Sequence, residues 1–281
     1  MTKTIGDVLS DAKQRIAPIS ASFSLDAQLM LAHVIGENRA HVIVHPERML
    51  TSEQVEQYEK LVARRADGEP IAYILGSRAF YDREFIVTPA VLIPRPETEH
   101  LLEMALDFVK EGHSPVTVVD VGTGSGALAI TLAANAPQAT VHAIDISPDA
   151  LAIAKLNAQE NEVDIIFHQG NLLQPLIDQE IRVDLVMANL PYIASEEVPI
   201  LAVSKHEPRL ALDGGPDGLD LIRELMKQVP LSVNSGGLIL LEIGAEQGAE
   251  TRLLVEEMQM NYTIAIHKDY AGHDRVVWIS L

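Results

Sequence analysis

The tetrapeptide Asn189-Leu190-Pro191-Tyr192 has the most specific chemical pattern in the chain. An amide or aromatic amine nitrogen is a poor nucleophile, because its lone pair is delocalised. The Asn189 side-chain oxygen and the Leu190 carbonyl can accept its N–H hydrogens, and Tyr192 can pack on the planar group. These acceptors would turn the remaining lone pair toward an electrophile without a general base. We expect catalysis and substrate binding at Asn189, Leu190, Pro191 and Tyr192.

A second pattern, Asp120-Val121-Gly122-Thr123-Gly124-Ser125-Gly126, joins a predicted strand to a predicted helix. Glycines are needed there because the turn is tight and the backbone must approach a ligand without intervening side chains. Asp145 ends the next strand, where it can accept hydrogen bonds from ribose hydroxyls. Asn171, after the third strand, can bind an adenine edge beside Leu172. The expected cofactor contacts are Asp120, Gly122, Thr123, Gly124, Ser125, Gly126, Asp145, Ile146, Asn171, Leu172 and Asn189.

The choice between two cofactor classes depends on Asp120. The glycines and Ala127 also fit the dinucleotide pattern G-x-G-x-x-A, and both classes use an acidic residue such as Asp145. Asp120 favours S-adenosylmethionine, whose amino-acid moiety carries an ammonium that needs a nearby anion. A nicotinamide-dependent oxidoreductase would also leave Asn189–Tyr192 unexplained. A non-catalytic adaptor is disfavoured by the completeness of both patterns.

The charge balance argues against a nucleic-acid substrate. The chain of 281 residues has 21 basic and 40 acidic residues, a formal net charge of −19, and nucleic-acid affinity depends largely on phosphate neutralisation. A DNA adenine-N6 methyltransferase stays an alternative, because the acceptor pair of Asn189 and Leu190 also suits an exocyclic amine. Such an enzyme would have to flip its target base out of the duplex. Cysteine is absent, and the histidines lack zinc-type spacing, so no metal is expected.

The termini and hydropathy indicate a cytoplasmic location. Residues 1–13 lack the apolar stretch of a signal peptide, and no apolar run is long enough for a membrane span. We expect no membrane and no direct nucleic-acid partner. A monomer is the default, because no self-pairing element is evident.

The positions of these motifs follow from an alternation of strands and helices after Pro115. Near-continuous apolar strands between amphipathic helices predict a mostly parallel sheet covered on both faces. Asn189 directly follows one of these strands, which gives functional meaning to an otherwise ordinary turn sequence. The predicted strands are Val116–Val121, Thr140–Asp145, Ile165–His168, Val183–Ala188 and Leu238–Ile243, with a closing pair at Tyr262–His267 and Arg275–Ile279. The predicted helices are Ala127–Ala134, Pro148–Gln159 and Leu219–Gln228.

The region before the sheet predicts a separate helical domain. Ser24 can cap a helix that ends at Gly36, and Thr51 with Gln54 forms a capping-box pattern. From about residue 71 to 92 the pattern becomes strand-like, which predicts a hairpin. Pro94 and Pro96 then stiffen the entry to another helix. The expected domains are 1–70, a hairpin linker at 71–95, and 96–281.

Motifs throughout the chain resemble those of the HemK/PrmC family of release factor glutamine methyltransferases. Beyond the glycine turn and Asn189–Tyr192, they are Gly68–Gly76, Ile93–Glu99, Glu207-Pro208, Asp213-Gly214-Gly215, Gly218-Leu219, Glu242-Ile243-Gly244 and Asp274–Val277. The resemblance implies an α/β fold: a Rossmann-like class I S-adenosylmethionine-dependent domain with a seven-stranded, mostly parallel sheet. A small helical substrate-recognition bundle would precede it, joined by a β-hairpin linker.

The same resemblance implies a reaction. The acceptor would be the side-chain nitrogen of the glutamine in the Gly-Gly-Gln motif of class 1 peptide chain release factors, with S-adenosylhomocysteine as the product. A related branch methylates a ribosomal-protein glutamine, but Pro94–Glu99 resembles the release-factor branch better. Arg95 and Glu97 are candidates for the substrate rim, although a structural ion pair explains such residues equally well.

Two positions depart from the family pattern. Leu190 stands where the family has proline. The φ angle of residue 190 is therefore not fixed by a proline ring, and Asn189 is no longer restricted by a following proline. Leucine keeps the backbone carbonyl, so we expect weaker preorganisation rather than lost function. Asn171 stands where the family commonly has aspartate, so a charged acceptor is replaced by an amide oxygen.

Overall fold

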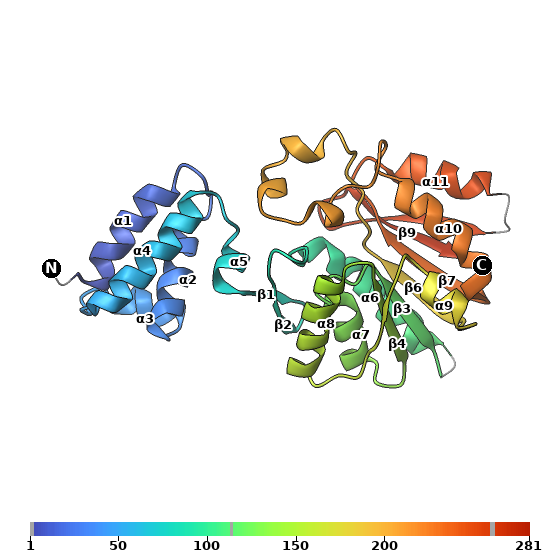
Figure 1. The fold of residues 1–281 in the computed structure, drawn as a ribbon, viewed down its shortest axis with the longest axis horizontal. Helices are drawn as coiled ribbons and strands as arrows, with labels where there is room; N and C mark the ends of the chain where they lie inside the picture. The colour runs from blue at the N-terminus through green and yellow to red at the C-terminus, as the bar shows by residue number, and fades with distance from the viewer. Residues whose placement is uncertain (1–2, 113–114, 259–261) are drawn as a thin grey trace. The chain divides into compact units, whose positions relative to one another are not determined.

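The computed structural model describes residues 3–112, 115–258 and 262–281, and it divides the chain into two compact units. They are Met1–Ser77 and Arg78–Leu281 (Figure 1). Each has a hydrophobic core of its own.

The first unit is a bundle of helices. Its helices are α1 (Ile5–Ile16), α2 (Phe23–Ile35), α3 (Arg39–Val44), α4 (Ser52–Ala66) and α5 (Ile71–Leu75). The capping box predicted at Thr51 and Gln54 is present at the start of α4. In the core, the buried Tyr58 hydroxyl donates to the Ala27 carbonyl at 3.0 Å, which satisfies its one polar atom.

Two local predictions for this unit are wrong. Helix α2 begins at Phe23 after Ser22, two residues earlier than the predicted cap at Ser24. Residues 71–75 form helix α5 rather than a strand, because their apolar face packs into the first core through Ile74 and the turn ends at Gly76 with φ 78°. A run of five mostly apolar residues is too short to show whether its pattern has the period of a helix or of a strand.

The predicted hairpin is formed by β1 (Ser77–Phe80) and β2 (Arg83–Ile86). Phe80 and Phe85 meet edge to face, with ring centroids 6.1 Å apart, in the core of the second unit. The Asn157 side chain accepts from the Ile86 N–H at 2.7 Å and donates to the Ile86 carbonyl at 2.9 Å. This part of the hairpin therefore packs within the second unit.

The second unit contains the predicted seven-stranded sheet, in the order β5-β4-β3-β6-β7-β9-β8. Strands β3 to β7 run parallel, and β9 runs antiparallel to both of its neighbours. The strands are β3 (Thr117–Val121), β4 (Thr140–Asp145), β5 (Ile166–Gln169), β6 (Val183–Ala188), β7 (Val233–Glu242), β8 (Thr263–Lys268) and β9 (Asp274–Ser280).

Helices cover both faces of this sheet (Figure 1). Consecutive residues of β3, Val118 and Val119, belong to different cores because they point to opposite faces of the sheet, which is why the strands are apolar throughout. One core includes residues of α6 (Glu99–Glu111), α7 (Ala127–Asn135) and α8 (Pro148–Glu160). The other includes residues of α9 (Gln174–Asp178), α10 (Asp220–Ser232) and α11 (Gly248–Glu257).

The strand order creates a switch point between β3 and β6. From β3 the chain moves outward through β4 to β5, and then returns to the other side of β3 as β6. In an open parallel sheet, ligands bind outside the carboxyl ends of the strands at such a point. The segments after β3 and β6 are the glycine turn and Asn189–Tyr192. Within the described residues, no helix is long and apolar enough to cross a membrane.

Candidate active site

A cavity lies at the switch point and collects most of the residues expected from the sequence. Residues of the glycine turn, of the end of β4 and of the segments directly after β5 and β6 line it, together with Thr98, Pro208, Leu210 and Ala211. Among the expected contacts, those in its wall are Asp120, Gly122, Thr123, Gly124, Ser125, Asp145, Ile146, Asn171, Leu172, Asn189, Leu190, Pro191 and Arg95.

Three glycines of the turn have left-handed backbone conformations. Gly122 and Gly124 have φ of 74° and 56°, which disfavour any residue with a Cβ. A Cβ on Gly124 would have no atom nearer than 4.0 Å, so that face is open to a ligand. Gly126, with φ 84°, instead leads into α7, and a Cβ there would approach Ile130 Cδ1 to 2.7 Å. Gly124 therefore leaves room for a ligand, whereas Gly126 serves packing, and a Cβ on Gly122 would meet the Leu190 side chain.

Two carboxylates are built into the wall. Asp145 is held by the N–H groups of Gly124 and Ser147, each donating at 2.9 Å. Asp120, 1% exposed, accepts from the Thr123 hydroxyl at 2.6 Å and the Ala129 N–H at 3.3 Å. Burial raises the pKa of Asp120 to about 7, and within the described residues no lysine or arginine pairs with it. A cation in the cavity would supply the missing counter-charge.

Apolar groups line the cavity between β4 and β5. The Ile146 side chain is 51% exposed although it lies in the wall, and Leu172 is buried beside it with φ 53°. Left-handed backbone is unusual for leucine and clusters at ligand sites. Asn171 is exposed at the same edge. This part of the wall suits a flat, weakly polar group with a polar edge.

The Asn189–Tyr192 segment presents two free acceptors. The register Val121↔Ala188 places Asn189 beside the start of the glycine turn. Within the described part of the chain, neither the Asn189 Oδ1 nor the Leu190 carbonyl accepts a hydrogen bond. Tyr192 contributes to a neighbouring groove instead of this cavity, and burial raises its pKa to about 12, so its phenol is neutral.

The backbone after Leu190 is fixed from two sides. The Gln247 side chain donates to the Tyr192 carbonyl at 2.8 Å, and the Gly214 N–H donates to the Ile193 carbonyl at 2.8 Å. A Cβ on Gly214 would lie 2.6 Å from the Pro191 carbonyl oxygen, so only glycine allows this approach. The Asp213-Gly214-Gly215 motif thus positions the acceptor loop.

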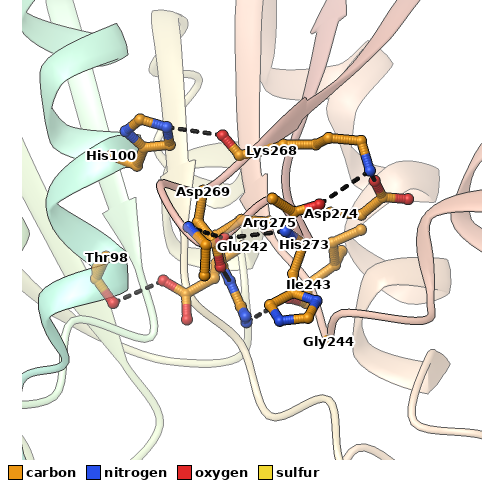
Figure 2. Close-up of polar contacts among 12 residues, drawn as sticks. Thr98, His100, Glu242, Ile243, Gly244, Lys268, Asp269, His273, Asp274 and Arg275 are labelled. Atoms are coloured by element: carbon orange, nitrogen blue, oxygen red, sulfur yellow. Dashed lines mark hydrogen bonds and ion pairs between the residues drawn. The ribbon is translucent and has the colours of Figure 1, made fainter.

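The Asn189 amide is also held by a buried chain of hydrogen bonds. Its Nδ2 donates to Thr98 Oγ1 at 3.0 Å. The Thr98 hydroxyl donates to Glu242 Oε2 at 2.6 Å (Figure 2). Thr98 and Glu242 are 5% and 2% exposed. Burial raises the pKa of Glu242 to about 7, against the opposing effects of the Thr98 hydrogen bond, of Arg275 and of the Asn189 side chain, which also interacts with this carboxylate.

The two candidate rim residues behave differently. Arg95 lines the cavity, but its Nη2 contacts both Glu207 carboxylate oxygens, at 2.7 and 2.6 Å, and the Glu207 side chain is 1% exposed. This pair ties the loop before α6 to the loop that supplies Pro208–Ala211. Glu97 is exposed and does not line the cavity.

Sequence reasoning missed Thr98, Glu242 and Gln247 as parts of the site. Thr98 and Glu242 are 144 positions apart, and no local pattern connects them. The available signal was that both stand in motifs of the family resemblance, Ile93–Glu99 and Glu242-Ile243-Gly244, without an assigned role.

The fold and the cavity at its switch point define a class I methyltransferase. A solved methyltransferase from Pyrococcus furiosus shares this fold with a TM-score of 0.52 and 16% identity, over 78% of this chain and 95% of that chain. The profile of the PrmC N-terminal domain matches residues 7–76, and that of the methyltransferase small domain matches residues 100–205.

Curated relatives identify the family. A release factor glutamine methyltransferase of Vibrio cholerae is 37% identical over 280 residues, covering 98% of this chain and 96% of the relative. One of Koribacter versatilis is 42% identical over 222 residues, covering 78% and 79%. The chain belongs to the family of release factor glutamine methyltransferases.

Proposed function

We propose that this protein transfers a methyl group from S-adenosylmethionine to the side-chain nitrogen of the glutamine in the Gly-Gly-Gln motif of class 1 release factors. The observation that carries the proposal is the pair of unused acceptors, Asn189 Oδ1 and the Leu190 carbonyl, at the wall of the cavity. A primary amide has two N–H hydrogens, so this pair matches its donors. The names of the curated relatives support the same acceptor.

The residues in the cavity wall fit S-adenosylmethionine. Gly124 leaves open space for close approach, Asp145 can accept from ribose hydroxyls, and Ile146 offers an apolar surface to a purine. Asp120 is a buried carboxylate without a protein cation among the described residues, as an ammonium group requires. When bound, the cofactor supplies a methyl group on a sulfonium.

The contribution of the protein is orientation and electrostatics. The two acceptors would hold the glutamine amide and favour positive charge developing on its nitrogen. Both are fixed before the substrate arrives, by the Thr98 bond to Asn189 and by the Gln247 and Gly214 bonds to the backbone after Leu190. Their orientation therefore costs little at the moment of transfer.

The partner and location follow from the same proposal. The helical unit Met1–Ser77 would recognise the release factor, and the protein would act as a monomer in the cytoplasm. The net charge of −19 supports a protein substrate over bare nucleic acid.

Methyl transfer from labelled S-adenosylmethionine tests the acceptor. We compare a class 1 release factor, its Gly-Gly-Gln glutamine→alanine variant, a ribosomal protein mixture and duplex DNA. The proposal expects label on the intact release factor alone. Label on DNA would support the adenine-N6 alternative, and label on ribosomal protein would support the other glutamine branch.

A further inference from the structure

The motif Ile93–Glu99 brings a hydroxyl to the catalytic loop from a distant part of the chain. Thr98 ends the 3-10 turn η1 (Pro96–Thr98) directly before α6. Its side chain is 5% exposed and belongs to the cavity wall. Asn189 and Glu242 each directly follow the last pair of the β6–β7 register, Ala188↔Leu241, which sets them side by side. Thr98 bridges these two side chains.

The direction of each hydrogen bond in this bridge is determined by chemistry. An ionised carboxylate only accepts, so the single hydroxyl proton of Thr98 goes to Glu242 Oε2. The Thr98 oxygen can then only accept from Asn189, which requires the Nδ2 end of that amide. The carboxylate therefore selects one of the two amide orientations of Asn189, the one with Oδ1 left free.

Glu242 is itself held in place by its surroundings. It pairs with Val276 in the β7–β9 ladder, and the preceding residue of β9, Arg275, donates from Nη1 to the Ile243 carbonyl at 3.1 Å. The Arg275 Nε donates to Asp269 at 3.1 Å (Figure 2). The charged groups that act on Glu242 are Arg275, which lowers its pKa, and Glu97, which raises it.

We propose that Thr98 and Glu242 are positioning residues that lock the Asn189 amide with its oxygen toward the substrate. This inference rests on the proposed transfer to a glutamine amide. Without the bridge, the Asn189 amide can turn over and present two N–H donors to a substrate that is also a donor. The substrate orientation, and hence the transfer rate, then suffers more than cofactor binding does.

Substitutions at Thr98 test the bridge. Thr98→Val removes the hydroxyl at nearly constant volume and should lower the single-turnover transfer rate by about tenfold or more, since a misplacement of about 1 Å can cost about a hundredfold. Thr98→Ser should recover most of the rate, and in both variants the change in the Kd for S-adenosylmethionine should be smaller than the change in the rate of Thr98→Val. Thr131→Val is the matched control, because this buried hydroxyl in α7 has no partner within the described residues. Equal rates for wild type and Thr98→Val, or an equal loss in Thr131→Val, would overturn the proposal.

The pH dependence of transfer tests Glu242. Its raised pKa of about 7 means that the carboxylate, and with it the selected orientation of Asn189, is present above that pH and lost below it. At saturating S-adenosylmethionine, where titration of Asp120 no longer limits cofactor binding, the single-turnover rate should rise with pH through this value. Glu242→Gln keeps an acceptor for Thr98 but does not titrate, so this rise should disappear. An unchanged pH profile in Glu242→Gln would contradict the proposal.

A measurement without turnover separates this inference from the proposed function. In protein labelled with ¹⁵N-asparagine, the Asn189 amide pair is assigned by its loss in Asn189→Asp. Thr98→Val should move these two resonances, and Thr131→Val should not. If wild type transfers no methyl group to any glutamine, the proposed function fails, while the resonances still test the bridge. If they stay in place in Thr98→Val, the bridge fails whatever the substrate.

Discussion

The Leu190 side chain lies beneath the glycine turn, where a Cβ on Gly122 would come within 3.1 Å of its Cδ2. It is 5% exposed and belongs to the core beneath β6 and β7. Leucine thus adds packing at a position where the family pattern has proline. Its N–H donates no hydrogen bond within the described residues, so proline would remove none.

A Leu190→Pro variant should transfer methyl groups faster than wild type in a single turnover. Restricting φ by proline is worth about 0.4–1 kcal/mol, or a factor of roughly two to five if it acts on the reactive loop conformation. Leu190→Ala is the control, since it loses similar packing but stays free at φ, and its rate should not rise. Equal rates for Leu190→Pro and wild type would show that preorganisation at this position is already complete.

The buried Asp120 makes stability depend on pH. Its pKa of about 7 in the folded state exceeds the ordinary value of 3.8. Between about pH 4 and pH 7, the folded state therefore keeps a proton on Asp120 that the unfolded state has lost. Stability of the cofactor-free protein should therefore fall as pH rises from about 4 to 7, by up to about 1.4 kcal/mol per pH unit for this proton. Asp120→Asn should flatten the fall, measured by denaturant unfolding across that range. A slope identical to wild type would contradict this account of Asp120.

At the scale of elements, the turns between strand and helix determine what can bind. Gly124→Ala would place a methyl group in the open face of the turn, at a φ of 56°. The Kd for S-adenosylmethionine should weaken at least about tenfold, which corresponds to about 1.4 kcal/mol. Gly36→Ala is a control with the same backbone penalty, since Gly36 has φ 68° with nothing within 4 Å. The Gly36→Ala variant should lose about 1 kcal/mol of stability. Its Kd for S-adenosylmethionine, measured by calorimetry, should equal that of wild type. Similar affinities of the two variants for S-adenosylmethionine would contradict the proposed close approach of the cofactor to Gly124.

The elements that could be predicted from sequence are those whose pattern is local. Strands Thr140–Asp145 and Val183–Ala188 match their predicted bounds, because they are apolar runs bounded by polar residues. Helix α5 was missed because five residues carry no clear period, and α11 had no assignment. The Thr98–Glu242 bridge is a tertiary contact between residues with separate local roles, so it required the structure.

At the scale of the whole molecule, two units with separate cores suggest two separate tasks. The second unit contains every residue of the cavity wall. We therefore expect a fragment of residues 78–281 to keep its affinity for S-adenosylmethionine and to lose affinity for the release factor, both measured by calorimetry. Circular dichroism checks that the fragment is folded. Unchanged release-factor affinity in a folded fragment would show that Met1–Ser77 does not dock the substrate.

The most direct test of the central claim is to locate the transferred methyl group by tandem mass spectrometry after incubation of the release factor with S-adenosylmethionine. With the wild-type protein, we predict one added methyl group, on the side-chain nitrogen of the Gly-Gly-Gln glutamine. With Asn189→Ala, which removes one of the two acceptors, the same site should be almost unmodified at a concentration of S-adenosylmethionine that saturates the variant. Methylation at another residue, or undiminished modification by Asn189→Ala, would contradict the assignment of this site to glutamine methylation.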